Sequence, residues 1–123
     1  MLLEGVPDNL SLLLSGRLTW PAVEMLLASG DAGFDCLIAP GHVATIMGPE
    51  EWRFVVDRYE IPAAIAGFDT GSLLAATYSV MRQHIEDHAF LDNCYPGVVR
   101  LGGNPDARQQ LATAMQVTAA NWR

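Results

Sequence analysis

Three short apolar runs, each bounded by turn-forming residues, most constrain what this chain can fold into. They span residues 10–15, 34–39 and 61–66. Runs of this length between glycine, proline, asparagine or aspartate residues are typical of buried strands. Stretches with helical spacing follow them, and strands that alternate with helices indicate a parallel sheet covered by helices. The sequence therefore predicts a three-layer α/β/α, Rossmann-like fold with a small, mainly parallel sheet and right-handed crossovers.

Helix signals fill the segments between these runs. Five helices are expected, and they begin near Thr19, His42, Pro49, Ser72 and Asn104. Thr19 and Asn104 are the expected N-caps of the first and last helices, because short polar side chains accept hydrogen bonds from free amide groups there. Asp69 or Thr70 is expected to cap the long helix over residues 72–88.

Apolar residues at helical spacing predict which helix faces turn inward. The helix that starts at Pro49 is expected to bury Trp52, Val55, Val56 and Tyr59. The long helix is expected to bury Leu73, Leu74, Ala76, Tyr78 and Met81. Residues 94–101 are ambiguous, because Val98 and Val99 favour a strand while Pro96 and Gly97 interrupt it.

Composition and charge exclude several classes of protein. A chain of 123 residues, half of them hydrophobic, is expected to form a single domain over residues 1–123. The net charge of −7 argues against nucleic-acid binding, which needs clustered cations. No apolar run approaches the roughly 20 residues of a membrane-spanning helix, and no basic segment of a signal peptide begins the sequence. We therefore expect a cytoplasmic protein that binds neither nucleic acid nor membranes.

No metal site is expected in this chain. Cys36 and Cys94 stand alone, without a Cys-x-x-Cys motif. Cys36 is expected to lie buried in the second strand, whereas the polar surroundings of Cys94 leave its role open. His84 and His88 have a spacing that can hold a metal, but they lack a third ligand and are expected at the surface.

A histidine on a Pro-Gly turn marks the candidate site. His42 follows the second apolar run, and ligands of open α/β sheets bind beyond the carboxyl ends of the strands. Its imidazole can relay a proton or bind a metal, or it can cap the short helix, and both interpretations stay open. Asp69 likewise can act in a site or cap a helix. The candidate cleft residues are Pro40, Gly41, His42, Thr45, Gly67, Asp69, Asn93 and Tyr95.

Several motifs together resemble a known family. They are Ala-Pro-Gly-His-Val at residues 39–43, Ile-Pro-Ala-Ala-Ile-Ala-Gly-Phe-Asp at 61–69, Asp-Asn-Cys-Tyr at 92–95 and Gly-Asn-Pro at 103–105. In order and spacing they are similar to the central part of the NiFe-hydrogenase maturation factor HypD family. The resemblance runs from about residue 9 to residue 123 but covers only a middle portion of the family's sequence. Cys94 stands where the family usually has glutamine, and Gly97 where it has arginine.

The resemblance implies a fold, partners and a function. It implies the second α/β domain of the family, as a fragment or a shortened relative, and a further strand beginning near residue 115 instead of a simple helix end. With HypC, the family serves as the scaffold on which the Fe(CN)2CO unit of NiFe-hydrogenase is assembled, and HypE delivers the cyanide-forming group. The family's iron-binding cysteines and its 4Fe–4S cluster lie outside the matched region, so no cofactor is expected here.

A second hypothesis comes from the residues themselves. The chain can be a small independent α/β ligand-binding module or enzyme that uses His42 and Asp69 as an acid/base pair. Under the first hypothesis it is not expected to be an enzyme on its own. An apolar face or sheet edge left by missing domains would then favour a homo-oligomer.

Overall fold

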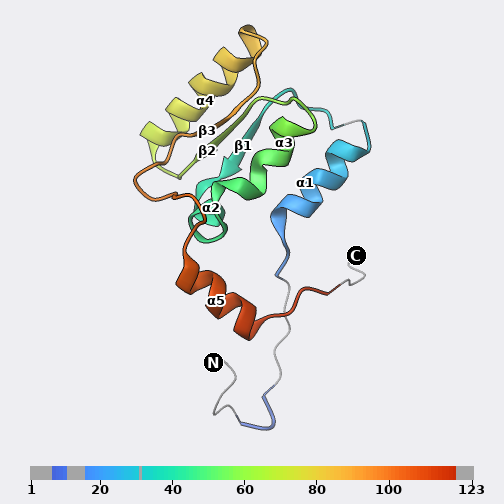
Figure 1. The fold of residues 1–123 in the computed structure, drawn as a ribbon, viewed down its shortest axis with the longest axis vertical. Coiled ribbons are helices and arrows are strands. Elements are labelled where there is room, and N and C mark those ends of the chain that lie inside the picture. The colour runs from blue at the N-terminus through green and yellow to red at the C-terminus, as the bar shows by residue number, and fades with distance from the viewer. Residues whose placement is uncertain (1–6, 11–15, 31, 119–123) are drawn as a thin grey trace.

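The computed structural model describes residues 7–10, 16–30 and 32–118 (Figure 1). Three parallel strands, β1 (Leu37–Pro40), β2 (Ala63–Ala66) and β3 (Leu91–Asn93), form a sheet in the order β1-β2-β3. The helices are α1 (Thr19–Ala28), α2 (Gly41–Met47), the 3-10 helix η1 (Pro49–Trp52), α3 (Arg53–Asp57), α4 (Thr70–Ile85) and α5 (Pro105–Ala114). Within the described part of the chain, none of the helices is long and apolar enough to cross a membrane.

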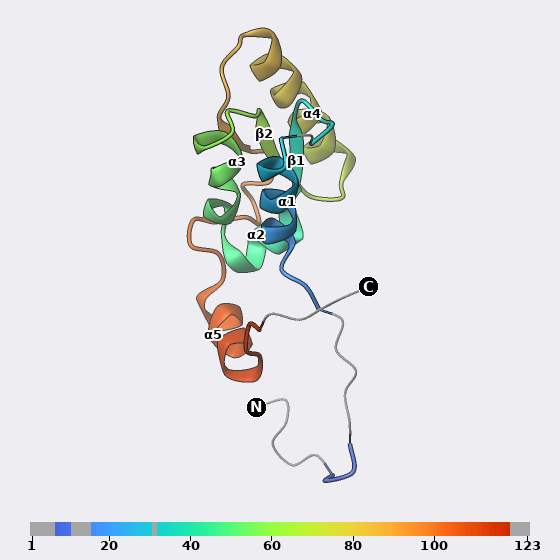
Figure 2. The same ribbon diagram turned by 90° about the vertical axis from the view of Figure 1, so that its right-hand side faces the viewer.

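The sheet is the middle of three layers, as the sequence predicted. Side chains of β2 alternate between two cores: Ala63 and Ile65 pack with α1 and α3, whereas Ala64 and Ala66 pack with α4. All four residues of β2 are buried. Figures 1 and 2 show α4 on one side of the sheet and α1 with α3 on the other. The α/β fold class is therefore confirmed.

One of the two crossovers departs from the expected right-handed connection. Both step in the same direction across the sheet, since the strand order follows the chain order. The first passes over the face of Ile65 through α3, and the second passes over the face of Ala64 through α4. Two such connections have opposite hands, so the right-handed rule fails for one of them. Trp52 and Val55, which are 1% and 0% exposed, hold the first connection on its face.

The inward face of α4 differs from the predicted one. Leu73, Leu74, Tyr78 and Met81 are between 41% and 67% exposed. The buried residues are Ser72, Ala76, Ser79, Val80 and Gln83, so of the predicted set only Ala76 lies inside. This face is small and polar because the helix lies over the alanines of β2, which leave little room for larger side chains.

Gln83 is the largest polar residue on this buried face, and its side-chain amide is fully hydrogen-bonded. Its Nε2 donates to the Ala63 carbonyl (3.3 Å) and to Ser79 Oγ (3.1 Å), and its Oε1 accepts from the Phe90 amide (2.9 Å). Because its donors and its acceptor are all engaged, the buried amide of Gln83 replaces the hydrogen bonds to water that it loses on burial. Gln83 thus joins α4 to β2 and to the segment that leads into β3.

Several boundaries also move. The strand expected at 34–39 is β1, and it begins only at Leu37. Phe34 therefore lies outside it, and Cys36 is exposed, not buried. The N-cap of α1 is Leu18 and makes no side-chain cap bond, so the expected cap at Thr19 is wrong. The caps at Asp69 and Asn104 are confirmed, since each accepts a backbone amide of its helix.

The third strand lies earlier than Val98 and Val99 suggested. Residues 91–93 pair with β2, and the Cys94 amide extends the pairing to the Ile65 carbonyl (3.0 Å). Residues 96–98 form a turn, because Pro96 and Gly97 outweigh the β-propensity of the two valines. Residues 115–118 are neither helix nor strand, and 119–122 lie outside the described part. The strand expected at 10–15 lies there too, apart from Leu10, which is not in a strand.

Candidate functional site

The carboxyl ends of the three strands meet where α2 begins. Gly41 follows β1 directly and is buried beneath the end of β2. A Cβ built on Gly41 would stand 2.5 Å from the Ala66 carbonyl oxygen, closer than any real side chain allows. Only glycine lets the start of α2 cross the strand end this closely. Pro40, the last residue of β1, pairs in register with Ala66.

Tyr95 fills the space between these strand ends. Its ring lies against Gly67, where a Cβ would come within 2.7 Å of Cζ, and against Gly41, where a Cβ would reach Cδ1 at 3.0 Å. The aromatic ring from the β3 end thus occupies notches that two glycines leave at the ends of β1 and β2. The structure thus brings three of the candidate cleft residues, Gly41, Gly67 and Tyr95, together at the carboxyl ends of the strands.

Asn93 holds the segment that carries Tyr95. Its Nδ2 donates to the Val99 carbonyl (3.0 Å), and its Oδ1 accepts from the Tyr95 amide (3.1 Å). The Val99 amide in turn donates to the Tyr95 carbonyl (2.9 Å). Both ends of the Asn93 amide are therefore engaged in closing the turn after β3. Its role in the structure is to position Tyr95.

His42 lies exposed at the same edge, in the first turn of α2. Its ring stacks on Phe68 with a centroid distance of 4.9 Å and an interplanar angle of 30°. Phe68 follows the end of β2 and is 83% exposed. An imidazole that is exposed on an aromatic platform is oriented and remains accessible to a partner group.

Asp69 lies at the same end of the sheet, but its carboxylate is already used. Oδ1 accepts from the Ser72 amide (2.8 Å) and Oδ2 from the Ser72 hydroxyl (2.7 Å). These bonds from Ser72 lower the pKa of Asp69 below its ordinary value, the hydroxyl contributing most. Among the described residues no hydrogen bond or ion pair joins His42 to Asp69. The capping interpretation of Asp69 therefore accounts for its geometry, and an acid/base pair has no contact to support it.

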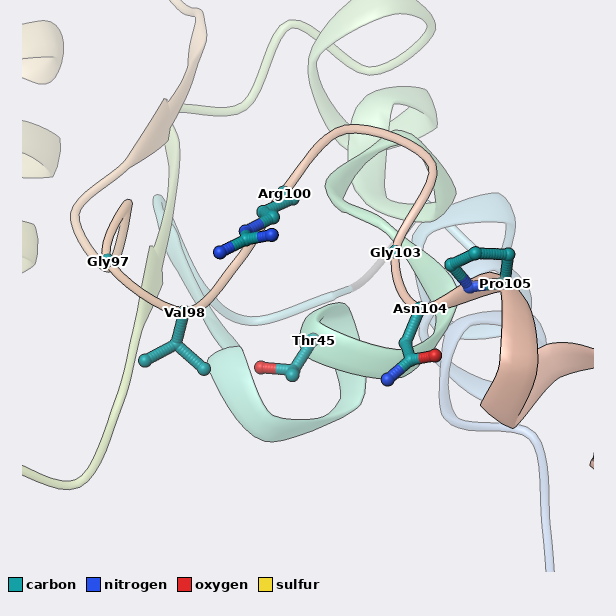
Figure 3. Close-up of a pocket in the computed structure, with 7 residues that line it drawn as sticks. All are labelled: Thr45, Gly97, Val98, Arg100, Gly103, Asn104 and Pro105. Atoms are coloured by element: carbon teal, nitrogen blue, oxygen red, sulfur yellow. The ribbon is translucent and has the colours of Figure 1, made fainter.

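Thr45 lies one turn further along α2, and its hydroxyl donates to the Gly41 carbonyl (2.8 Å). It faces a pocket of about 430 Å³ between α2 and the loop that leads to α5 (Figure 3). The other residues that line the pocket are Gly97, Val98, Arg100, Gly103, Asn104 and Pro105. The loop is fixed to α2, since the Asn104 amide donates to the Ile46 carbonyl (3.0 Å).

The donor groups do not fit an iron–sulfur cluster. Cys36 is exposed ahead of β1, and Cys94 is half-buried after β3. Burial, with the neighbouring carboxylate of Asp92, raises the pKa of Cys94 to about 11, which disfavours the thiolate that metals bind. Within the described ranges, three or more His, Cys, Asp or Glu side chains nowhere gather as metal ligands would. The absence of iron from the chain stays a prediction for metal analysis.

Two residues of this region escaped the sequence reasoning. Phe68 stands between Gly67 and Asp69, with no apolar residue directly beside it in the sequence. That isolation was the available signal for an exposed platform. Arg100 is one of seven arginines, which form no cluster in the sequence. Only the fold places it in a pocket.

The chain is similar to proteins of one family. The family model described as HypD: Hydrogenase formation hypA family matches residues 2–123. Over 104 residues, 84% of this chain and 28% of the relative, it is 33% identical to the hydrogenase maturation factor HypD of Escherichia coli (strain K12). Over 116 residues, 94% of this chain and 32% of the relative, it is 31% identical to a putative hydrogenase expression/formation protein of Methanocaldococcus jannaschii. The chain thus spans less than a third of the length of either relative.

Proposed function

The chain belongs to the HypD family, and on this premise we propose that it acts in hydrogenase maturation as a scaffold domain and not as a self-sufficient enzyme. The observation that carries the proposal is the stacked pair of His42 and Phe68, exposed at the edge where the strands end. Among the described residues, no hydrogen bond or ion pair joins this oriented, accessible imidazole to an acid, and no cluster of metal ligands accompanies it, so it supplies one part of a site.

The rest of that site would come from other parts of a HypD protein or from other proteins. The relatives are about three times as long as the matched region, so most of their residues lie outside it. We propose that His42 positions a group or relays a proton at a metal held by cysteines elsewhere in the assembly. The proposed partners are HypC and HypE, and the proposed task is assembly of the Fe(CN)2CO unit.

A second candidate, an independent enzyme with His42 and Asp69 as its acid/base pair, is less well supported. Both carboxylate oxygens of Asp69 accept hydrogen bonds from Ser72, and its lowered pKa makes it a weak base. A base that caps a helix would have to break those bonds to work. The geometry therefore favours the scaffold function.

Complementation tests the proposed function. In a full-length HypD relative, replacing the histidine aligned with His42 by alanine should reduce hydrogenase activity in a strain that lacks its own HypD. In this chain, His42→Ala should leave thermal unfolding nearly unchanged, because surface substitutions usually cost less than about 0.5 kcal/mol.

His84→Ala is the matched control for unfolding, since His84 is also exposed but lies on α4. Full hydrogenase activity in the aligned histidine variant would contradict the proposed role. A large loss of stability in His42→Ala, with none in His84→Ala, would instead make the histidine a structural residue.

A further inference from the structure

The pocket beside α2 carries an excess of positive charge in an acidic chain. Arg100 is the only charged residue among the seven that line it. Asp106, in the first turn of α5, does not line it. The chain has a net charge of −7, yet this pocket is lined by an arginine and by no carboxylate.

Arg100 has an unused guanidinium. Arg53 pairs with Asp57, Arg58 with Glu24 and Arg82 with Glu86, and Arg108 donates to the Gly102 carbonyl. In the described part of the chain, no such hydrogen bond or ion pair engages the side chain of Arg100. Arg100 lines the pocket, and Figure 3 shows its side chain beside its own loop, on the side of Val98. Five N–H groups in a planar fork are thus available there.

Asn104 adds a second donor group. Its Oδ1 accepts from the Ala107 amide (3.1 Å), which fixes the orientation of the side chain. Figure 3 shows the nitrogen of Asn104 on the side of Thr45, away from α5. Thr45 is not a further donor, because its hydroxyl proton is used in the bond to the Gly41 carbonyl and only its oxygen is free to accept a hydrogen bond. Val98 and Pro105 provide apolar surface in the same pocket.

We propose that this pocket binds the oxyanion of a small organic molecule, a carboxylate or a phosphate group, at the guanidinium of Arg100, with the amide of Asn104 as a further donor that lines the same pocket. An arginine fork binds both groups with two parallel hydrogen bonds. A volume of about 430 Å³ lies in the range of small-molecule sites and leaves room for an organic body against Val98 and Pro105. The proposal is independent of the proposed role of His42.

A second pocket offers a comparison for the proposed anion site. It has about the same volume, 440 Å³, and also contains an arginine, Arg53. There the arginine pairs with Asp57 (3.3 Å), and Glu50 lines the same pocket. Its one cation is neutralised and a further carboxylate repels anions. Arg53 therefore offers a control with the same charge in a pocket of the same size.

Titration of the ¹⁵N-labelled 123-residue chain tests the proposal, with inorganic phosphate and succinate as separate probes at constant ionic strength. Saturable shifts are expected for the Arg100 Nε–H and for the side-chain amide of Asn104. Arg100→Gln should weaken binding at least tenfold, in line with the loss of charge-assisted hydrogen bonds. Arg53→Gln should leave the affinity unchanged.

The remaining outcomes also decide the question. Arg100→Lys keeps the charge but not the fork, so an intermediate affinity supports bidentate recognition. Tighter binding of succinate or of phosphate assigns the ligand to the carboxylates or to the phosphates. Shifts that do not saturate with either probe, or equal weakening by Arg53→Gln and Arg100→Gln, would mean that only diffuse attraction acts, and the proposal would be overturned.

Discussion

The ring of Tyr95 lies directly on the backbone of Gly67, where a Cβ would come within 2.7 Å of the ring carbon Cζ. Gly67 directly follows β2 and is buried, whereas Tyr95 follows β3. The contact joins two neighbouring strand ends without a hydrogen bond between the two residues. The packing of this sheet edge, which also carries His42, therefore requires that residue 67 has no Cβ.

Gly67→Ala is therefore expected to destabilise the chain by about 1–3 kcal/mol, the usual cost of overpacking a close contact. The tyrosine ring would have to move away from both glycine notches. Gly97→Ala is the control, because a Cβ at Gly97 meets nothing within 4 Å. Urea unfolding of both variants gives the comparison. Equal stability of the two variants would show that the Tyr95 ring yields freely.

Asp69 should make the stability of the chain depend on acid pH. Its pKa is lowered in the folded chain, so its contribution is present above the pKa of the unfolded carboxyl group and is lost as the pH falls through the folded value. Asp69→Ala should lower the melting temperature at pH 7. The gap to the unmodified chain should shrink below about pH 4.

Asp69→Asn separates the charge of Asp69 from its capping role, because asparagine caps helices as well as aspartate does. This variant should keep most of the stability at pH 7 and lose part of the acid-dependent slope. Thermal melts between pH 3 and pH 7 measure both effects. An Asp69→Ala deficit that does not change over this range would mean that the ionised carboxylate adds nothing to the cap.

Gln83 should be costly to replace although leucine has a similar size. Gln83→Leu leaves the part-buried Phe90 amide without its acceptor at 2.9 Å, and a donor left unsatisfied away from water costs up to about 1–3 kcal/mol. Gln109→Leu on α5 is the matched control, since Gln109 is exposed, and it should change stability by less than about 0.5 kcal/mol. Urea unfolding distinguishes the two. A stabilised Gln83→Leu variant would contradict the inferred role of this amide.

Cys94 should react slowly with thiol reagents. A pKa of about 11 leaves little thiolate at pH 8, and the higher nucleophilicity of that thiolate compensates only in part. We expect Cys94 to be labelled more than about tenfold slower than an ordinary free cysteine, and exposed Cys36 to be labelled first. Mass spectrometry of partly labelled chain identifies the order.

Asp92→Asn tests the cause of the slow labelling. This substitution removes the carboxylate that helps to raise the pKa of Cys94, so labelling at Cys94 should become faster. In urea both cysteines should react at similar rates. Faster labelling of Cys94 than of Cys36 in the unmodified folded chain would contradict the raised pKa.

The sequence predicted the parts of the fold that depend on local chemistry. Glycine and proline turns located β1 and β2 to within three residues, and the polar residues Asp69 and Asn104 are N-caps as expected. The apolar face of Trp52 and Val55 was also predicted, because large apolar side chains have few places outside a core. Such signals need only a few neighbouring residues.

The parts that were missed depend on distant neighbours. The inner face of α4 is small because β2 is made of small residues, and Gln83 is buried because the Ala63 carbonyl and the Phe90 amide lie beside it. In the candidate site, the common sheet edge followed from the topology. The use of Asp69 by Ser72, the stacking of Phe68 on His42 and the free guanidinium of Arg100 required the three-dimensional arrangement.

The alanine-rich central strand limits how sequences with this fold can diverge. Three of its four residues are alanine, and helices pack on both of its faces. Ala63 and Ala64 are fully buried, so a larger side chain at either position would overpack the core. Substitutions to larger residues are therefore disfavoured at these two positions. The outer face of α4 and the part of α5 after Pro105, where no residue is buried, can change more freely. Relatives about one third identical should therefore differ mostly on these helices, while side-chain volume along the strand stays close to that of alanine.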